Sequence, residues 1–459
     1  MEQIVGELSA PDCVFRVIQM RISGRNRAAN GLSDTQTWIE NMRIGTIVIA
    51  SLGTFFTSAA AADDWNRFRG PSGQGIATSV VPVEWSRTER VAWSFKLPGE
   101  GSSSPIVVGS RVFVTCYSGE VGAESRRHLI CVDADSGEEL WQRSIDGPQR
   151  EDDYQGYLTE HGYASGTPVS DGKNVYAFFG KAGVVAYTVD GQKLWQKDVG
   201  QQSSNRRWGS GSSPVLFNDI LIVNASEEGR AILGLSAEDG RQLWKAEYDR
   251  LELCYATPVL ITGDGDVTEA VLSMPGEVWG LNAANGKLRW YCEIENGGNV
   301  SPGVVVSDDT LFTFGGFPQQ QTNAIKRGGR KDITDSHRLW QNKDSSYVAT
   351  PLFLDDHLYW VSDRGQAFVA NAKTGETVQR ARLAGLESGG RPVYASPVKA
   401  GDHIYVVSRR SGTYVFEANP SMAQVAQNER LDDSDFNGTP AISDGKMYLR
   451  SNSSLYCIK

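Results

Sequence analysis

Short runs of β-branched and aromatic residues, separated by glycine turns, recur along the chain after residue 63. In one repeat the runs are residues 174–179 (NVYAFF), 183–188 (GVVAYT) and 193–197 (KLWQK), and a Thr167-Pro168 pair opens a further short strand before them. Runs of this kind, bounded by turn residues, are typical of antiparallel strands. Helical periodicity is almost absent over the same stretch. The pattern therefore predicts a chain of hairpins with four strands in each repeat.

Two phrases mark the period of the repeat. The first is a glycine turn followed four residues later by tryptophan, as in VDADSGEELW, YTVDGQKLW, LSAEDGRQLW and LNAANGKLRW. The second is a small or hydroxyl residue followed by proline and β-branched residues, and its eight prolines are Pro105, Pro168, Pro214, Pro258, Pro302, Pro351, Pro397 and Pro440. Repeats of about 40–50 residues built of short strands indicate propeller blades. We expect an all-β, eight-bladed β-propeller with four-stranded antiparallel blades.

The recurring tryptophans have a structural interpretation. An indole just past a tight turn offers a large apolar face and one N–H group to the next blade. We expect this docking role for Trp93, Trp141, Trp195, Trp244, Trp290 and Trp340.

The two ends of the repeat region are complementary. The chain ends on SLYCIK, which matches the third strand of a blade, and no fourth strand follows it. Residues 90–97 (RVAWSFKL) have the pattern of that missing strand, including its tryptophan. We therefore expect the N-terminal strand to complete the C-terminal blade and close the ring, which leaves no exposed edge. Deletion of residues 63–98 is expected to abolish folding.

Residues 42–62 have the three-part form of a secretory signal peptide: a basic start, an apolar core and an Ala-rich cleavage site. The apolar core is shorter than the ~20 residues of a membrane span, although an N-terminal anchor stays open as an alternative. No cysteine follows the cleavage site, so a lipoprotein is not expected. Residues 1–41 are interpreted as a non-native or disordered extension before a true start at Met42, and residues 63–459 as one propeller domain of a periplasmic or secreted protein.

Charge and cysteine content exclude two classes of site. The net charge of −10 disfavours a nucleic-acid partner, which needs a basic face. Cys116 and Cys131 flank a predicted hairpin and are candidates for a disulfide, while the alternative is that all cysteines after residue 63 are small buried residues. They show no CxxC spacing and no histidine at ligand spacing, so no metal site is expected.

The repeats resemble the pyrroloquinoline-quinone-like (PQQ-like) propeller repeat, whose signature is close to A-x-D-x-x-T-G-x-x-x-W. The resemblance rests on VDADSGEELW, LNAANGKLRW and NAKTGETVQ and covers essentially residues 65–459. It extends to secreted bacterial PQQ-like proteins through WNRFRGPSGQG and, more distantly, to the propeller lipoprotein of the outer-membrane β-barrel assembly machinery. Relatives that are alcohol or sugar dehydrogenases hold PQQ with calcium in the central funnel, and many carry adjacent cysteines. This chain has no such cysteine pair and no recognisable ligand set, so no cofactor is expected.

Three segments are longer than the repeat requires: residues 146–165, 200–213 and 316–337. Long loops on a rigid scaffold concentrate function, and His161, Arg207, Trp208 and Asp332 are candidates to line a polar pocket for an anionic or sugar-like ligand. The alternative is that they are exposed or internally paired loop residues.

No catalytic motif was found, so no catalytic residue is proposed from the sequence. We expect a monomeric, non-catalytic binding or scaffold module of the cell envelope, with an extracytoplasmic protein partner or a small polar ligand. The alternatives are a PQQ-dependent oxidoreductase and a carbohydrate-directed binding protein or enzyme.

Overall fold

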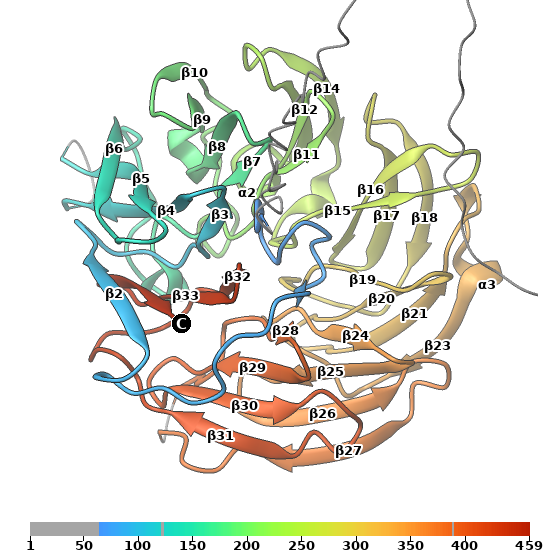
Figure 1. The fold of residues 1–459 in the computed structure, drawn as a ribbon. Helices are drawn as coiled ribbons and strands as arrows, with labels where there is room; N and C mark the ends of the chain where they lie inside the picture. Colours follow the sequence, from blue (N-terminus) through green and yellow to red (C-terminus); the bar gives the residue numbers. More distant parts are fainter. Residues whose placement is uncertain (1–63, 121–123, 388–389) are drawn as a thin grey trace, which may run out of the picture. The chain divides into compact units, whose positions relative to one another are not determined.

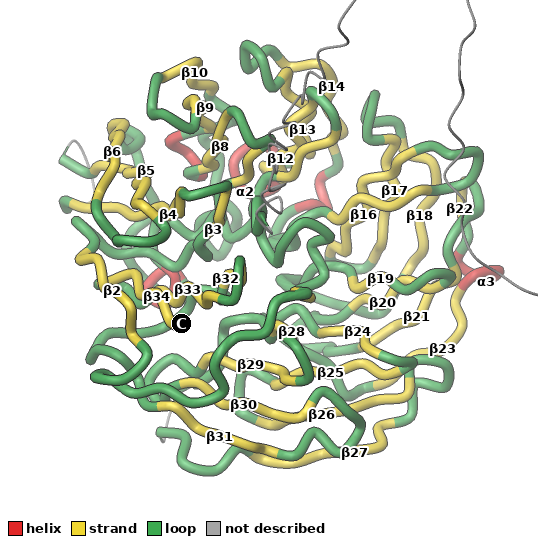
Figure 2. The backbone as a smooth tube through the Cα atoms, in the orientation of Figure 1, coloured by secondary structure: helices red, strands yellow, loops and turns green. Residues whose placement is uncertain are grey.

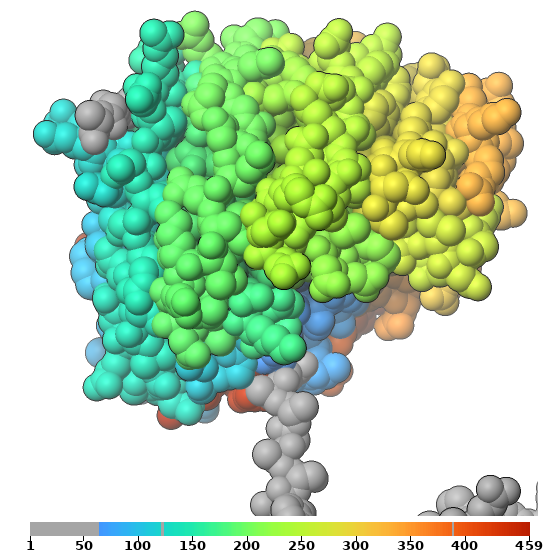
Figure 3. Space-filling model, turned by 90° about the horizontal axis from the view of Figure 1, so that it is seen from above, coloured from blue at the N-terminus to red at the C-terminus, as the bar shows by residue number. Residues whose placement is uncertain are grey.

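The computed structural model describes residues 64–120, 124–387 and 390–459. They form eight sheets arranged around one axis, which confirms the predicted eight-bladed propeller (Figure 1). Neighbouring blades pack as contiguous bands in the space-filling view (Figure 3). The signal peptide expected at 42–62 and the extension expected at 1–41 lie outside the described residues.

Each blade has four antiparallel strands that follow one another from the axis outward. In blades 1 to 4 they are β3 (Ile106–Val108), β4 (Arg111–Ser118), β5 (Arg126–Asp133) and β6 (Glu139–Asp146); β7 (Val169–Ser170), β8 (Asn174–Phe178), β9 (Val184–Thr188) and β10 (Lys193–Lys197); β11 (Val215–Phe217), β12 (Ile220–Ala225), β13 (Ala231–Ser236) and β14 (Gln242–Glu247); β15 (Val259–Thr262), β16 (Thr268–Met274), β17 (Glu277–Asn282) and β18 (Leu288–Glu293).

In blades 5 to 8 the strands are β19 (Val305–Val306), β20 (Thr310–Thr313), β21 (Thr322–Lys326) and β23 (Arg338–Asn342); β24 (Leu352–Leu354), β25 (His357–Val361), β26 (Gln366–Asn371) and β27 (Thr377–Arg382); β28 (Val398–Ala400), β29 (His403–Val407), β30 (Thr413–Glu417) and β31 (Gln424–Asn428); β32 (Ala441–Ser443), β33 (Lys446–Arg450), β34 (Ser454–Ile458) and β2 (Val91–Lys96). Two further strands add in parallel, β1 (Ile76–Ala77) beside β28 and β22 (Lys331–Asp332) beside β18.

Helices are confined to single turns between strands (Figure 2). They are α1 (Leu158–His161), α2 (Ser226–Gly229) and α3 (Thr334–His337), with 3₁₀ turns η1 (Gly180–Ala182) and η2 (Asp249–Leu251). In the described part of the chain, none has the length and apolar character needed to cross a membrane.

The ring closes as the sequence predicts. Strand β2 pairs antiparallel with β34, with Trp93 opposite Cys457 and Phe95 opposite Leu455. The first and last strands of the ring therefore share one sheet, and the C-terminal blade has a full outer strand. Loss of β2 exposes the edge of β34, and loss of β34 leaves β2 without a partner, so the closure couples the two ends of the described ring.

Five of the six tryptophans contact the following blade. Their indole N–H groups donate to carbonyls in the turn of that blade, at 2.9 to 3.2 Å, in the pairs Trp93 with Ala134, Trp141 with Val189, Trp195 with Ala237, Trp244 with Ala283 and Trp340 with Ala372. A glycine of the same turn lies against the indole ring, as Gly240 does on Trp195. A bulge one residue before the tryptophan redirects the outer strand, as at Leu194 between Lys193 and Trp195.

Trp290 differs from the other five. Its N–H donates to Glu269 Oε2 of its own blade at 2.8 Å, and the ring is fully buried. The reason is β22, which comes from the next blade and pairs with β18 at Trp290. Trp290 is therefore covered by strand β22, whereas the other five tryptophans are covered by a glycine turn of the next blade.

Residues 64–77 form a plug across the centre of the ring, which the sequence did not predict (Figure 1, blue). The backbone of Trp65 accepts from Val107 in blade 1, that of Asn66 accepts from Ser170 in blade 2, and β1 pairs with β28 in blade 7. Arg69 is 1 % exposed, and its guanidinium donates to the carbonyls of Gln74, Thr350, Pro351 and Pro397.

The candidate disulfide between Cys116 and Cys131 is not formed, and the alternative of buried free cysteines holds. Cys116 and Cys131 are free thiols. Across the β4–β5 pair Cys116 lies opposite His128, and Cys131 lies opposite Phe113, so the two thiols are out of register and face opposite sides of the blade. Cys116 packs towards blade 8 and Cys131 towards blade 2, and burial raises the pKa of both thiols to about 12.

Candidate functional site

A cavity of about 170 Å³ lies on the axis, where the chain enters the inner strands. Its wall is made by residues just before the inner strands, by the two connections 157–165 and 208–213, and by Phe68 of the plug. All eight blades therefore contribute to it, and the plug holds one side of it closed.

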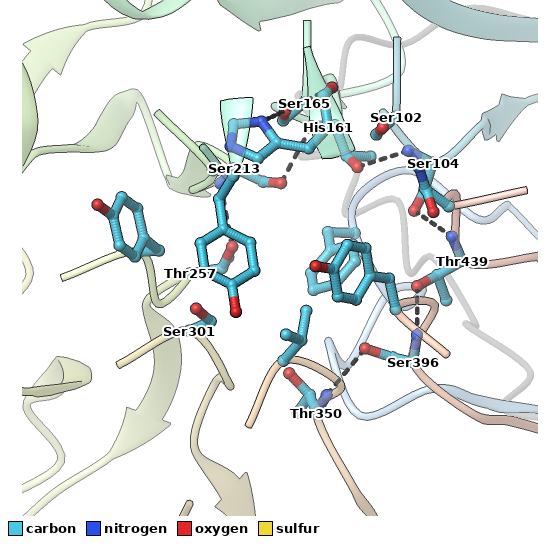
Figure 4. A pocket seen from close by; sticks show the side chains of 18 of the residues that line it. Ser102, Ser104, His161, Ser165, Ser213, Thr257, Ser301, Thr350, Ser396 and Thr439 are labelled. Atoms are coloured by element: carbon cyan, nitrogen blue, oxygen red, sulfur yellow. Dashed lines mark hydrogen bonds between the residues drawn. The ribbon is translucent and has the colours of Figure 1, made fainter. Parts of the chain in front are cut away.

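Eight hydroxyl residues, one per blade, form a belt around the cavity (Figure 4). Each directly precedes one of the eight prolines, and they are Ser104, Thr167, Ser213, Thr257, Ser301, Thr350, Ser396 and Thr439. Small side chains fit here because the inner strands converge on the axis. From the sequence this position was expected only to be small or hydroxyl, although Ser and Thr alternate before all eight prolines.

The belt is joined by hydrogen bonds from blade to blade. The backbone N–H of one belt residue donates to the hydroxyl oxygen of the next, at 2.9 to 3.0 Å, in the steps 104 to 167, 167 to 213, 213 to 257, 350 to 396, 396 to 439 and 439 to 104. The circuit opens between Thr257 and Ser301, and Gly303 N–H donates to Thr350 instead, at 2.8 Å. Each of these hydroxyls accepts one bond, so its own proton remains available to a ligand.

Other polar atoms of the wall have no protein partner. Ser102 Oγ, Tyr394 OH and Asn437 Oδ1 are buried and make no hydrogen bond within the described residues. Asn437 itself is only 9 % exposed, and its amide N–H donates to the carbonyl of Glu160 at 2.6 Å. A buried polar atom without a partner costs about 1–3 kcal/mol, so their presence in one cavity points to a ligand or to water as the partner.

Three aromatic residues of the wall, Tyr157, Trp208 and Tyr347, continue into Phe317 outside it; we call these four residues, with Arg206 and Arg391, the mouth cluster. Ring centroids are 4.5 Å apart for Tyr157 and Trp208, 6.2 Å for Tyr157 and Tyr347, and 5.8 Å for Phe317 and Tyr347. Arg391 lies 4.4 Å from the Tyr347 centroid and Arg206 lies 5.6 Å from that of Trp208. Arg391 forms an ion pair with Asp363, which is not part of the lining, so the positive charge of Arg391 is compensated outside the cavity.

His161 stands in the cavity wall on α1. Its Nδ1 lies 2.6 Å from Ser165 Oγ, and burial lowers the pKa of the imidazole to about 4. A base works best when its pKa is close to the operating pH, so this histidine is a weak base at neutral pH although a serine lies beside it. The arrangement favours a hydrogen-bonding role over nucleophilic catalysis.

The structure brings together only two of the four residues proposed from the sequence. His161 and Trp208 both line the cavity, whereas Arg207 is exposed beside it and is not part of the lining. Asp332 lies in β22 at the outer edge of blade 4, where its carboxylate accepts from Tyr291 OH at 3.2 Å. The physical reason is that residues 316–337 are not one loop: residues 322–326 are β21, and the segment after them is drawn to the outside of the ring.

The lining does not fit PQQ with calcium. Calcium is held by several carboxylate and carbonyl oxygens, and a quinone that bears carboxylates needs cationic partners. No aspartate, glutamate, lysine or arginine is among the residues that line the cavity, and no group of three or more metal-ligating side chains occurs among the described residues.

Residues 125–381, more than half of the chain, match the family described as outer membrane protein assembly factor BamB. The chain belongs to this family. That assignment confirms the predicted PQQ-like propeller with a distant relationship to the assembly lipoprotein.

Two curated relatives are similar over parts of the chain. The outer membrane protein assembly factor BamB of Burkholderia pseudomallei (strain K96243) is 22 % identical over 359 residues, which is 69 % of this chain and 84 % of that protein. The polyvinylalcohol dehydrogenase of Sphingopyxis sp. (strain 113P3) is 26 % identical over 199 residues, and these are 40 % of this chain and only 28 % of that enzyme.

Among solved structures, BamB from Moraxella catarrhalis superposes with a TM-score of 0.58 at 13 % identity, covering 80 % of this chain and 99 % of that one. The computationally designed Ika8 protein gives 0.51 at 12 % identity, covering 79 % and 98 %. At such identities the likeness shows the fold alone.

Proposed function

We propose that the protein is a non-catalytic scaffold of the cell envelope that binds an extracytoplasmic protein through the mouth cluster. The observation that carries the proposal is the composition of that cluster. Aromatic residues and arginine are the side chains enriched at the energetic centres of protein interfaces. Phe317 is 43 % exposed, Tyr157 and Trp208 are partly exposed, and the buried Tyr347 packs between Phe317 and Tyr157, so the cluster offers a partner three accessible aromatic side chains on a fixed support.

Two further points support this function. The family, and the relative that shares most of its length with this chain, carry the name of an outer membrane assembly factor, a role that requires a protein partner in the envelope. The His161–Ser165 pair has a depressed imidazole pKa, which disfavours hydrolytic chemistry at the same place. A monomer in the periplasm or outside the cell is part of the proposal.

Site-specific photo-crosslinking in the native envelope tests the proposal. A photoreactive phenylalanine analogue at Phe317 replaces one exposed aromatic side chain by another and is expected to give a discrete cross-linked protein. The matched control places the same analogue at Leu339, which is 53 % exposed on the outer strand of the same blade. Equal cross-linking from both positions, or none from Phe317, would contradict a partner at the mouth.

A further inference from the structure

The cavity behind the mouth cluster has features that a protein partner at the mouth leaves unexplained. The hydroxyl belt lines it together with Ser102, Tyr394 and Asn437, whereas Phe317 and the two arginines of the mouth cluster are not among its lining residues. From the chemistry of this lining we infer that the cavity binds one uncharged, polyhydroxylated sugar ring. The inference goes beyond the proposed scaffold role and does not depend on it.

Hydrogen-bonding capacity is the first argument. Belt hydroxyls accept a backbone N–H on one side and keep a proton to donate on the other. Within the described part of the chain, Tyr394 OH and Ser102 Oγ are buried and make no hydrogen bond, and Asn437 Oδ1 is an unused acceptor. A ligand that presents several groups which both donate and accept can satisfy such a ring of atoms, and a sugar ring has this property on its whole perimeter.

Charge is the second argument. The lining has no acidic or basic residue, and His161 is neutral above about pH 5 because burial lowers its pKa to about 4. Arginines near the wall are engaged elsewhere: Arg391 pairs with Asp363, Arg409 pairs with Glu160 and Asp435, and Arg69 donates to the backbone carbonyls of Thr350 and Pro351. A charged ligand would lose its hydration here without gaining a partner ion, which is costly. The cavity therefore selects neutral molecules.

Size and aromatic content are the third argument. The volume of about 170 Å³ lies below the ~300–1,000 Å³ of sites for drug-sized ligands, which suits a single ring rather than a chain. Two aromatic residues of the lining outside the mouth cluster, Tyr255 and Tyr394, supply apolar ring surface for the C–H groups of such a ring. The ring can be a free monosaccharide or the terminal unit of a glycan, since both present the same chemistry to this wall.

Titration calorimetry with the purified protein tests the inference. The probes are glucose, galactose and N-acetylglucosamine, their charged counterparts glucuronate and glucosamine, and a neutral oligosaccharide. At least one neutral sugar is expected to bind, with its charged counterpart at least tenfold weaker. Tighter binding of the oligosaccharide than of its monomer identifies a glycan end as the natural source, and the reverse order identifies a free sugar. Failure of every neutral sugar to bind, or equal binding of a charged one, overturns the inference.

Two variants locate the binding. Tyr394→Phe removes only a hydroxyl that has no protein partner, so affinity is expected to fall about 3- to 10-fold while the melting temperature stays equal or rises. Ser102→Ala also removes a single hydroxyl, from a different residue of the wall, and the same loss of affinity is expected. Tyr359→Phe is the control, because Tyr359 is a buried tyrosine of blade 6 outside the cavity. The inference is overturned if Tyr394→Phe and Ser102→Ala bind the sugar with wild-type affinity, or if Tyr359→Phe loses as much affinity as they do. Either result leaves the scaffold proposal standing, because cross-linking at Phe317 decides that proposal.

Discussion

Arg69 shows how a single residue can hold the centre of the ring. It is buried without a carboxylate, and its guanidinium donates hydrogen bonds to four backbone carbonyls, three of them at the proline positions of blades 6 and 7. Burial lowers the pKa of its guanidinium to about 9, so it stays charged at neutral pH. The charge is stabilised by carbonyl dipoles from segments that are far apart in sequence.

Replacement of this arginine is the first prediction. Arg69→Met keeps much of the volume but leaves the carbonyls without their donor, so the free energy of unfolding is expected to fall by about 2–4 kcal/mol. Denaturant unfolding measures the change. Arg364→Met, at an exposed arginine, is the control with an expected change near zero. An Arg69→Met protein as stable as the control would show that the plug contributes little.

Glu228 gives a prediction for the dependence of stability on pH. Burial raises the pKa of its carboxyl to about 8, while Ser210 donates to Oε1 at 2.5 Å. Between the ordinary value and about pH 8 the folded state binds more protons than the unfolded state, so this group's contribution is full at low pH and is lost as the pH rises.

Glu228→Gln keeps the acceptor for Ser210 and removes the ionisation. Its stability relative to wild type is expected to increase from about pH 5 to about pH 9, as measured by denaturant midpoints at both pH values. The exposed Glu139→Gln serves as the control and should run parallel to wild type. If the stability of Glu228→Gln changed with pH in parallel with that of wild type, the Glu228 carboxyl could not be neutral in the folded protein.

At the scale of the element, the repeat works through one contact between blades. A tryptophan of one outer strand lies on a glycine turn of the next blade, and the glycine has a positive φ, as at Gly240 with φ +73°. The turn needs glycine for two reasons, its backbone conformation and the space for the indole. These two reasons can be separated experimentally.

Gly240→Ala adds a methyl group 2.6 Å from the Trp195 ring, whereas Gly265→Ala has nearly the same φ, +72°, with open space around the added carbon. Both variants carry the backbone cost, about 1–2 kcal/mol. Gly240→Ala is expected to lose about 1–3 kcal/mol more, because the indole must move. Thermal and denaturant unfolding of the pair measures the difference. Equal losses would mean that the docking contact is not tightly packed.

The sequence predicted these elements because their signals are local. A glycine turn, a tryptophan and a proline recur at fixed offsets, and each marks a particular strand. The prediction failed at Asp332, where a polar segment rich in glycine has the composition of a loop but pairs as β22 with a neighbouring blade. That pairing depends on the position of blade 4 in space, and no periodicity of residues 316–337 records it. The choice between a disulfide and free cysteines at Cys116 and Cys131 was open for a similar reason, since the register of β4 and β5 decides which residues face each other.

At the scale of the molecule, the ring closure was predictable and the plug was not. Closure follows from a missing strand at one end and a spare strand at the other. Residues 64–77 have no strand pattern in the sequence and, apart from the two-residue strand β1, they contact several blades through scattered hydrogen bonds, so only the assembled ring gives them a conformation. The eight proline positions of the belt could be predicted from the sequence. The closed circle of hydroxyl groups could not, because it forms only when all eight blades are assembled around the axis.

Two truncated chains distinguish the contribution of ring closure by β2 from the contribution of the plug formed by residues 64–77. A chain that begins at Val81 retains β2 and is expected to unfold cooperatively at a lower temperature than the full chain. A chain that begins at Leu97 lacks β2 and is expected to lose cooperative unfolding, because β34 then has a free edge. Calorimetry and near-ultraviolet circular dichroism record both outcomes. A cooperative transition in the shorter chain would contradict closure by β2.

The central claim for the whole molecule is that the axis of this propeller is an uncharged binding cavity and not a quinone site. Titration of the purified protein with PQQ in the presence of calcium, followed by absorbance and by reduction of a dye with alcohols and sugars, tests it most directly. The lining residues carry no charge for either group, so neither stoichiometric uptake of the quinone nor dye reduction is predicted. Stoichiometric PQQ with turnover of an alcohol or a sugar would contradict the claim.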